Sequence, residues 1–437
     1  MSGVLDRYLS HLQTQQPWRW RGQVVESIGY TIESAGPVAS VGECCEIEDR
    51  DGAKHLAEVI GFRGSRVISM PLMTTDGVRF GDGVTALGRG PEVIVGEGVI
   101  GQIINGMGAP LDGRRIIGET ERLPLEGNLH TPTDRIPIQV PLGTGIKAVD
   151  GLLTVGRGQR LGIFGGSGVG KSTLIGIMTR NTEADVTVVG LVGERGREVR
   201  EFVERALGKE GLARSVVVVS TSDESPLMRM RAAMTATTIA EYFARKGKAV
   251  LLVLDSLTRF AMAAREIGLA AGEPPTAKGY TPSVFSRLAK LVERAGNFPS
   301  GSITAFYTVL MEGDDQQDPI VDAVRSLLDG HVVLSRKLAA EGWYPPIDLL
   351  DSISRLMPAV TQKNHREHAA LFRRMMATYA RSEDLVRIGA YKVGADPDLD
   401  RALNSRSAMR EFIVQTGAER LSFQDCLRRL SALAEEI

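Results

Sequence analysis

Residues 165–172 near the middle of the chain read Gly-Gly-Ser-Gly-Val-Gly-Lys-Ser, which fits the pattern Gly-x-x-x-x-Gly-Lys-Ser. Glycines at these positions let the backbone turn so that successive N–H groups point inward at an anion. The runs before and after the motif indicate a short buried strand and the first turns of a helix, whose positive end favours the same anion. The motif therefore predicts a polyphosphate site. Its predicted binding residues are Gly165, Gly166, Ser167, Gly168, Val169, Gly170, Lys171, Ser172 and Thr173.

Two side chains at the end of this motif supply the chemistry that a nucleoside triphosphate requires. The ammonium group of Lys171 can reach the terminal phosphates, and the hydroxyl group of Ser172 can bind Mg²⁺. The alternative is an ordinary glycine-rich turn, in a chain that contains 49 glycines. The flanking strand and helix favour nucleotide binding, so the sequence predicts a protein that binds ATP or GTP.

Acidic residues follow two other apolar runs, at the strand ends where ligands bind in parallel α/β sheets. Asp255 directly follows residues 250–254 and fits a second, Mg²⁺-organising carboxylate, although an aspartate there can also cap a turn. Glu194 and Arg195 follow residues 186–192. The glutamate could activate a water molecule as a general base and the arginine could hold a phosphate, or both could belong to a solvated helix start. Spacing alone leaves these alternatives open.

The composition restricts the class of protein. With 437 residues the chain is long for one hydrophobic core, so two or three domains are expected. Lys plus Arg (52) and Asp plus Glu (53) nearly cancel, which gives no overall attraction to nucleic acid or to an anionic membrane. The spacing of Cys44, Cys45 and Cys426 suits no metal site and indicates a reduced compartment. No apolar run approaches the ~20 residues of a membrane helix, and no signal segment is evident, so a cytoplasmic protein is expected.

The residue pattern changes three times along the chain. Residues 1–21 have the spacing of a short amphipathic helix, which could dock on a partner or fold onto the next domain. Residues 22–90 contain short strand-like runs between turn signals, as in a small β-barrel. Residues 91–358 begin with a connector rich in glycine and proline (91–136) and then alternate strands with helices, which predicts a mainly parallel sheet. Residues 359–437 are predicted to be helical.

Individual elements can be placed within this outline. Ser422 with Asp425 predicts a capping box at the start of the last helix. His365 and His368 have no third ligand nearby, so they are predicted to lie on a solvated helix face and not at a metal site. The strand-like runs of the central region are residues 161–164, 186–192, 216–220, 249–254 and 302–309.

Together, the motifs resemble those of the flagellar and type III secretion export ATPases, relatives of the catalytic heads of rotary ATP synthases. The resemblance covers essentially the whole chain. It implies a multidomain α/β protein with a small N-terminal β-barrel, a central RecA-like P-loop NTPase domain with a mainly parallel sheet, and a C-terminal helical domain. The residues that carry it, in order, are 165–172, 193–202, 254–260, 279–285, 301–309 and 348–355.

The resemblance implies a role for each site residue. Glu194 matches the glutamate that activates water, Arg195 its neighbour on the phosphate side, and Arg259 a further contact to the γ-phosphate. Tyr344 matches the tyrosine that stacks on adenine. The implied catalytic residues are Glu194, Lys171, Arg195, Arg259 and Arg355, and the implied Mg²⁺ ligands are Ser172 and Asp255.

Arg355 has a special place in this set, because it matches an arginine finger offered to the nucleotide of the neighbouring subunit. Such a finger stabilises charge in the transition state and is worth ~10³-fold or more in rate. One chain then supplies both halves of each site, so the resemblance implies a homo-hexamer.

The resemblance also implies partners and a location. The implied partners are a stator-like regulator that binds the N-terminal helix, a central stalk protein, the export gate and chaperone–substrate complexes, with no nucleic acid among them. The protein is then expected to be peripheral at the cytoplasmic face of the inner membrane without spanning it.

Several functional classes remain in competition. Residues 312–319, Glu-Gly-Asp-Asp-Gln-Gln-Asp-Pro, resemble the flagellar branch more than the injectisome branch. A rotary synthase subunit is disfavoured because the tail lacks an acidic run, and Glu194 argues against a non-catalytic ring subunit. A nucleic-acid translocase is disfavoured by the balanced charge and by the low aromatic content of 5%.

Overall fold

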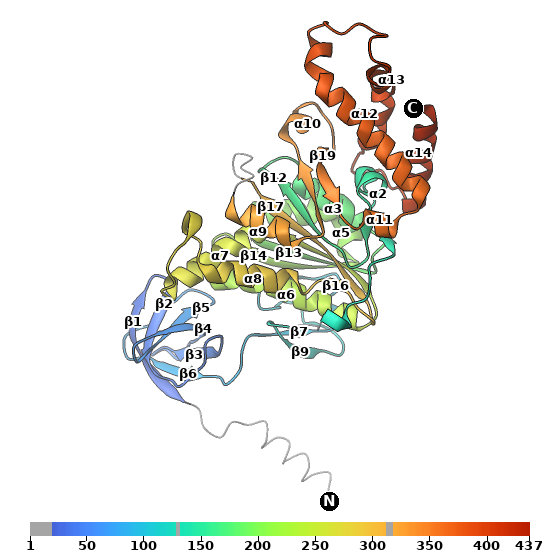
Figure 1. The fold of residues 1–437 in the computed structure, drawn as a ribbon. Helices are drawn as coiled ribbons and strands as arrows, with labels where there is room; N and C mark the ends of the chain where they lie inside the picture. Colours follow the sequence, from blue (N-terminus) through green and yellow to red (C-terminus); the bar gives the residue numbers. More distant parts are fainter. Residues whose placement is uncertain (1–19, 128–131, 312–317) are drawn as a thin grey trace, which may run out of the picture.

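The computed structural model describes residues 20–127, 132–311 and 318–437, which form three successive parts (Figure 1). The predicted helix in residues 1–21 and most of the 312–319 motif lie outside the described residues. No helix in the described residues is both long and apolar enough to span a membrane. The domain boundaries predicted above stay a prediction.

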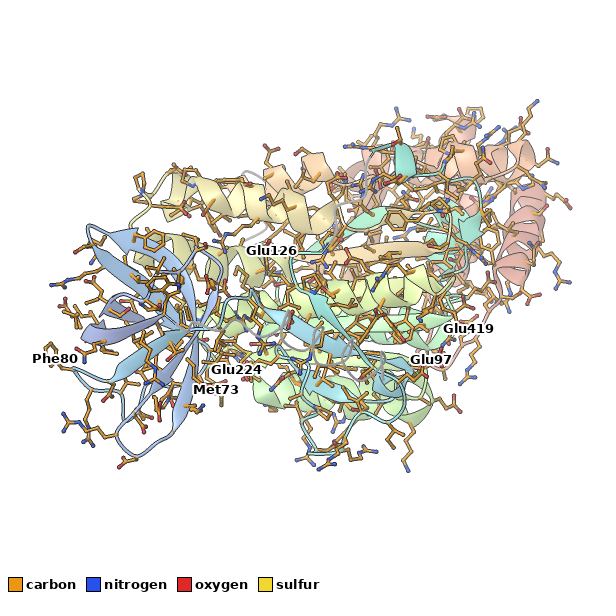
Figure 2. All side chains as sticks on the ribbon, turned by 90° about the horizontal axis from the view of Figure 1, so that it is seen from below. Met73, Phe80, Glu97, Glu126, Glu224 and Glu419 are labelled. Atoms are coloured by element: carbon orange, nitrogen blue, oxygen red, sulfur yellow. The ribbon has the colours of Figure 1, made fainter. Side chains whose placement is uncertain are left out.

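Six antiparallel strands close into a barrel at the N-terminal end, in the order β1-β2-β5-β4-β3-β6. Alternate side chains point inward along these strands, and Ile32 and Ile47 are fully enclosed. Met73 and Phe80 lie on the outside of this part of the molecule (Figure 2) and are 68% and 75% exposed. The strands are β1 (Arg21–Ile28), β2 (Thr31–Ala35), β3 (Cys44–Glu48), β4 (Lys54–Arg63), β5 (Arg66–Pro71) and β6 (Gly83–Ala86).

The central domain contains a sheet in the order β19-β18-β12-β17-β15-β13-β14-β8. All neighbours in this order run parallel except β18 and β19. Each of the five predicted apolar runs lies within a strand of this sheet, so that prediction is confirmed. The strands are β8 (Ile103–Asn105), β12 (Arg160–Gly165), β13 (Val186–Glu194), β14 (Ser215–Thr221), β15 (Ala249–Asp255), β17 (Ser302–Leu310), β18 (Gly330–Leu334) and β19 (Ile347–Ser354).

Helices cover both faces of this sheet, which is why its strands read as continuous apolar runs. Leu252 and Leu254 pack on one face with α6 (Pro226–Arg245), α7 (Leu257–Ala270) and α8 (Pro282–Val292). Leu251 and Val253 pack on the other face, in the same core as α2 (Lys147–Leu152) and α3 (Lys171–Asn181). The sheet therefore divides the domain into two cores. Its carboxyl edge presents the residues discussed below.

Short elements complete this domain. The connector contributes η1 (Glu97–Val99) and a ribbon of β7 (Glu92–Val95) and β9 (Glu121–Pro124). The remaining short elements are η2 (Pro132–Asp134), β10 (Pro141–Leu142), β11 (Val155–Gly156), α4 (Gly196–Glu201), the π-helix η3 (Phe202–Leu207), α5 (Gly208–Leu212), η4 (Ala277–Gly279), β16 (Gly296–Asn297), α9 (Pro319–Leu327) and α10 (Arg336–Ala340).

The C-terminal part consists of the short α11 (Met357–Val360) and of α12 (Lys363–Arg387), α13 (Pro397–Ile413) and α14 (Phe423–Glu436), at the end of the molecule opposite the barrel (Figure 1). The Ser422 hydroxyl accepts a hydrogen bond from the Asp425 N–H (3.1 Å) and donates one to the Asp425 carboxylate (2.6 Å), so the two predicted residues cap the last helix, with a hydroxyl donor in place of the backbone donor of a capping box. Phe372 and Phe412 join this part to the core that contains α2 and α3.

One prediction for this region is wrong. His365 does not lie on a solvated face: it is 8% exposed, and its Nε2 lies 2.7 Å from the carbonyl oxygen of Gly151. Burial lowers the pKa of the imidazole. His365 instead connects α12 to α2 through this contact. The spacing of the two histidines could not indicate a contact with a distant helix.

A buried ion pair between Arg294, just after α8, and Glu241 on α6 also contacts the connector. Arg294 is 4% exposed at its side chain; Nε and Nη2 each donate to a different carboxylate oxygen of Glu241 at 2.7 Å, and Nη1 donates to the Leu125 carbonyl at 2.8 Å. Arg294→Met should lower the free energy of unfolding by about 3–5 kcal/mol, because Glu241 would stay buried without its partner. Urea unfolding followed by circular dichroism measures this loss. The exposed Arg200→Met should leave the midpoint unchanged, and equal midpoints for both variants would contradict the prediction.

Candidate active site

The phosphate-binding loop connects the carboxyl end of β12 to the first turn of α3. Gly168 (φ 79°) and Gly170 (φ 94°) have left-handed backbone angles, which explains the glycines of the motif at these two positions. The loop borders a cavity of about 1300 Å³. Its predicted members that line the cavity are Ser167, Gly168, Gly170, Lys171, Ser172 and Thr173.

Lys171 and Asp255 meet inside this cavity. The distance between Lys171 Nζ and Asp255 Oδ1 is 3.1 Å, and both side chains are largely buried. Thr308 on the neighbouring strand β17 donates its hydroxyl hydrogen to the same carboxylate oxygen at 2.6 Å. Asp255 is thus held in place at the carboxyl edge of the sheet, as its position after an apolar run suggested. It lies within reach of any cation bound between it and the phosphates.

Glu194 ends the adjacent strand β13 and lines the same cavity. Burial, the charge of Asp255 and a hydrogen bond with Glu198 raise the pKa of its carboxyl group to about 7. A carboxyl group with a pKa near neutrality is well suited to accept a proton from water. Glu194 is therefore not merely a solvated helix start.

Two arginines close to Glu194 differ in their surroundings. Arg259, on α7, packs beside Gly193, where an added Cβ would lie 3.3 Å from the arginine Cβ. Within the described residues its buried Nε has no hydrogen-bond partner, so a donor remains for a ligand such as a phosphate oxygen. Arg195 is 75% exposed at its side chain and lies 3.4 Å from Glu198, at the border of the cavity.

Tyr344 lies beside the loop. A Cβ added at Gly170 would lie 3.8 Å from its ring, and the residue is 48% exposed. A partly exposed aromatic ring next to the phosphate-binding loop is placed where a base could stack on it. The geometry therefore fits the adenine contact implied by the resemblance.

Arg355 is the one predicted residue that does not lie near the others. It directly follows β19, which runs antiparallel to β18, and its N–H donates to the Asp329 carbonyl at 3.0 Å. The Asp329 carboxylate also accepts a hydrogen bond from the N–H of Arg160, at the amino end of β12. Arg355 thus lies at the opposite end of the sheet from the loop, a β12 length of roughly 20 Å away.

Comparisons with known proteins agree with this geometry. The nucleotide-binding domain of the ATP synthase alpha/beta family matches residues 145–354, and the β-barrel domain of that family matches residues 24–88. The T3SS EscN ATPase C-terminal domain matches residues 361–432. The flagellum-specific ATP synthase of Treponema pallidum (strain Nichols) is 51% identical over 98% of this chain and 96% of its own length. The type 3 secretion system ATPase of Xanthomonas euvesicatoria is 46% identical, over 99% of this chain and 98% of its own length.

The chain belongs to the family of flagellar and type III secretion ATPases. A solved structure of this family, the assembled ATPase EscN of the enteropathogenic E. coli type III secretion system, matches with a TM-score of 0.89 and 43% identity, over 94% of this chain and 100% of that chain. EscN in complex with its central stalk EscO matches with a TM-score of 0.87 and 42% identity, over 94% of this chain and 100% of that chain. The predicted fold class and the resemblance are thereby confirmed.

Some residues of this family member's cavity were not predicted from sequence. Thr308 fixes Asp255, Glu198 contacts Glu194, and Arg336 lies against the phosphate-binding loop. Gly417 and Arg420 of the C-terminal part also line the cavity. Each of these residues lies on a different element from the residue it contacts. Glu198 on α4 is close in sequence, four residues after Glu194, and could have been found from that spacing.

The raised pKa of Glu194 predicts a pH dependence of hydrolysis. The base must be ionised, and its pKa of about 7 lies above the ordinary 4.5, so activity should fall as the pH drops below 7. At pH 6 the value of kcat/KM for free enzyme should be about one tenth of its alkaline plateau. Initial rates between pH 5.5 and 8.5 test this. The residual rate of Glu194→Gln should lack this limb, and a flat wild-type profile would contradict the assignment.

Proposed function

We propose that this protein is a Mg²⁺-dependent ATPase that acts as a hexameric ring and drives or prepares protein export through the flagellar type III secretion apparatus. The observation that carries the proposal is the convergence of Lys171, Asp255, Glu194 and Arg259 on one cavity beside the phosphate-binding loop. These groups provide the positive charge, the metal ligand and the base that phosphoryl transfer to water requires.

Each residue then has a definite task in ATP hydrolysis. The loop N–H groups and Lys171 hold the β- and γ-phosphates, and Glu194 takes a proton from the attacking water. Arg259 offers its buried Nε to the γ-phosphate. Arg195 lies at the border of the cavity and would contact the phosphates from its exposed side. Tyr344 stacks on the adenine ring, which favours ATP as the substrate.

The residues fit a magnesium ion. Ser172 offers a hydroxyl oxygen and Asp255 a buried carboxylate that already lies 3.1 Å from one cation, the Lys171 ammonium group. Oxygen ligands of this kind, together with phosphate oxygens, are those that Mg²⁺ prefers. When bound, the ion would neutralise phosphate charge. Residues Ser172 and Asp255 would hold it.

The position of Arg355 supports the proposed ring. Because this arginine lies at the opposite end of the sheet from its own loop, it would serve a nucleotide held by a neighbouring subunit. The assembled state of the similar EscN supports such an arrangement. A closed ring of identical subunits then completes every site at an interface.

The flagellar branch is supported by three flagellar relatives and by one sequence motif. Flagellum-specific ATP synthases from Treponema pallidum, Pseudomonas aeruginosa and Bacillus subtilis are 50–51% identical to this chain. Type 3 secretion ATPases are 46–48% identical, and two further flagellum-specific ATP synthases, from Salmonella typhimurium and Aquifex aeolicus, are 47% and 45% identical, so the two ranges overlap. The motif at residues 312–319 supports the same branch. An injectisome ATPase is the alternative, because the flagellar and the type 3 secretion relatives differ little in their identity to this chain.

The proposed surroundings follow from the family. EscN binds a central stalk, EscO, and we assign this chain an equivalent stalk protein. A stator-like regulator would bind the N-terminal helix, and the export gate and chaperone–substrate complexes would be further partners. The protein would then lie in the cytoplasm, peripheral to the inner membrane.

The experiment that tests this function has two arms. Purified protein should hydrolyse ATP in the presence of Mg²⁺, with a specific activity that rises steeply with protein concentration as the ring assembles. In a flagellated host lacking its own flagellar ATPase, the gene should restore motility, whereas an injectisome ATPase would not. A low-salt oligonucleotide shift, without Mg²⁺-ATPase activity, would instead favour a nucleic-acid translocase.

A further inference from the structure

A short segment between β18 and β19, residues 335–346, touches the phosphate-binding loop at two points. A Cβ added at Gly166 would lie 2.3 Å from Arg336 Nη2, so the guanidinium group packs directly on the loop backbone. A Cβ added at Gly170 would lie 3.8 Å from the ring of Tyr344, at the other end of the segment. Both ends of the loop are therefore in contact with this one segment.

Arg336 is the group that a side chain at residue 166 would meet. The motif leaves this position open to any residue, and Gly166 is not among the glycines with a left-handed backbone. A side chain at this position would be restricted by the guanidinium group and not by the backbone angles. Arg336 lines the same cavity as Lys171 and Ser172. Gly166 and Arg336 therefore form one structural pair at the phosphate site.

The same segment contacts the C-terminal helical part through an ion pair, two hydrogen bonds and the Arg410 guanidinium group, which lies 5.5 Å from the centre of the Trp343 ring. Lys337 Nζ lies 2.7 Å from Glu383 Oε2 on α12. Arg410 on α13 donates to the carbonyl of Glu341 at 3.2 Å, and the N–H of Gln415 donates to the carbonyl of Tyr344 at 2.7 Å. The segment thus lies between the loop and the helices and contacts both.

We propose that Arg336 is a positioning residue for the phosphate-binding loop. We further propose that the Lys337–Glu383 ion pair couples α10, which carries Arg336, to the position of the C-terminal helical part. This rests on the proposed nucleotide site. Loop N–H groups bind phosphates only in one backbone geometry, so displacement of Arg336 weakens nucleotide binding. The proton transfer at Glu194 is left intact, because that residue lies on β13, three strands away from β12 in the sheet.

The Gly166–Arg336 pair is tested by the steady-state kinetics of four variants. Arg336→Ala and Gly166→Ala should each raise KM for ATP about 10-fold with kcat changed less than about threefold, because a displaced loop binds the phosphates less well while the base stays in place. Because an alanine at residue 166 would displace the guanidinium group, the double variant should equal either single variant. Arg336→Lys should restore part of the affinity. Additive single effects, or a loss confined to kcat, would overturn the proposal.

The link to the helical part is tested through the ion pair. Lys337→Ala and Glu383→Ala should each raise KM about twofold to threefold, and neither should add to the effect of Arg336→Ala. Lys363→Ala breaks an exposed pair with Glu367 within α12 and is the matched control, with no change expected. An undiminished effect of Lys337→Ala in the Arg336→Ala background would overturn the link. Wild-type protein that binds no nucleotide would instead remove the proposed function, and melting temperatures separate both outcomes from misfolding.

Discussion

A mixture of two inactive variants, Arg355→Ala and Glu194→Gln, is expected to regain ATPase activity. Each variant alone should lose ~10³-fold or more in kcat, because one lacks the arginine finger and the other the base. In a randomly mixed ring, about a quarter of the interfaces pair an intact Glu194 with an intact Arg355 from the neighbour. Activity should therefore return to about a quarter of the wild-type value.

The structural reason is the separation of Arg355 from the loop of its own chain. Arg355 follows β19 and is hydrogen-bonded to Asp329 at the amino edge of the sheet, whereas Lys171 and Glu194 lie at the carboxyl edge. No side-chain rotation crosses a strand length of roughly 20 Å. If Arg355 contributes to catalysis, a second subunit must bring it to the nucleotide.

The matched control is a mixture of Glu194→Gln with Lys171→Ala. Both changes lie in the same half of the site, so every interface keeps one defect and the mixture should stay inactive. Steady-state ATP hydrolysis at a concentration that supports assembly measures both mixtures. Equal recovery in the two mixtures, or a fully active Arg355→Ala, would contradict a site completed by the neighbour.

Much of the central domain could be predicted because of its parallel sheet. A parallel strand is buried on both faces, so residues 249–254 read as an unbroken apolar run. Ligands gather at the carboxyl ends of such strands, which led to Glu194 and Asp255 without any knowledge of the fold. The cavity brings both carboxylates together with Lys171.

Other parts of the site could not be predicted, for physical reasons. The contact of Arg336 with Gly166 depends on β18 lying next to β12, and strand order cannot be read from a local pattern. Thr308 reaches Asp255 through the register of β17 against β15. The burial of His365 could not be predicted from the spacing of the histidines, because it depends on α2, over 200 residues earlier in the chain. Local patterns therefore identify the residues of single elements but not their neighbours.

Glu194→Gln is expected to separate binding from hydrolysis. Glutamine keeps the shape of the side chain but cannot accept a proton, so kcat should fall by ~10³-fold or more. ATP affinity should stay equal or increase, because a partly ionised carboxyl group no longer faces the phosphates. Lys171→Ala should instead weaken ATP binding itself, because it removes a positive charge that holds the phosphates. Equilibrium dialysis with ATP and single-turnover hydrolysis measure the two quantities separately.

A second glutamate, ten residues further along the chain, tests whether the separation of ATP binding from hydrolysis is specific to residue 194. Glu204 is 58% exposed at its side chain and forms an ion pair with the exposed Arg200, so Glu204→Gln should keep wild-type kcat and affinity. The two glutamates differ in burial, and the surroundings of Glu194 raise the pKa of its carboxyl group to about 7. Since the pKa is raised by burial and by Asp255, the same environment that makes Glu194 a good base also keeps it protonated below pH 7. Wild-type turnover by Glu194→Gln would place the base elsewhere in the cavity, with Glu198 the nearest carboxyl group to examine.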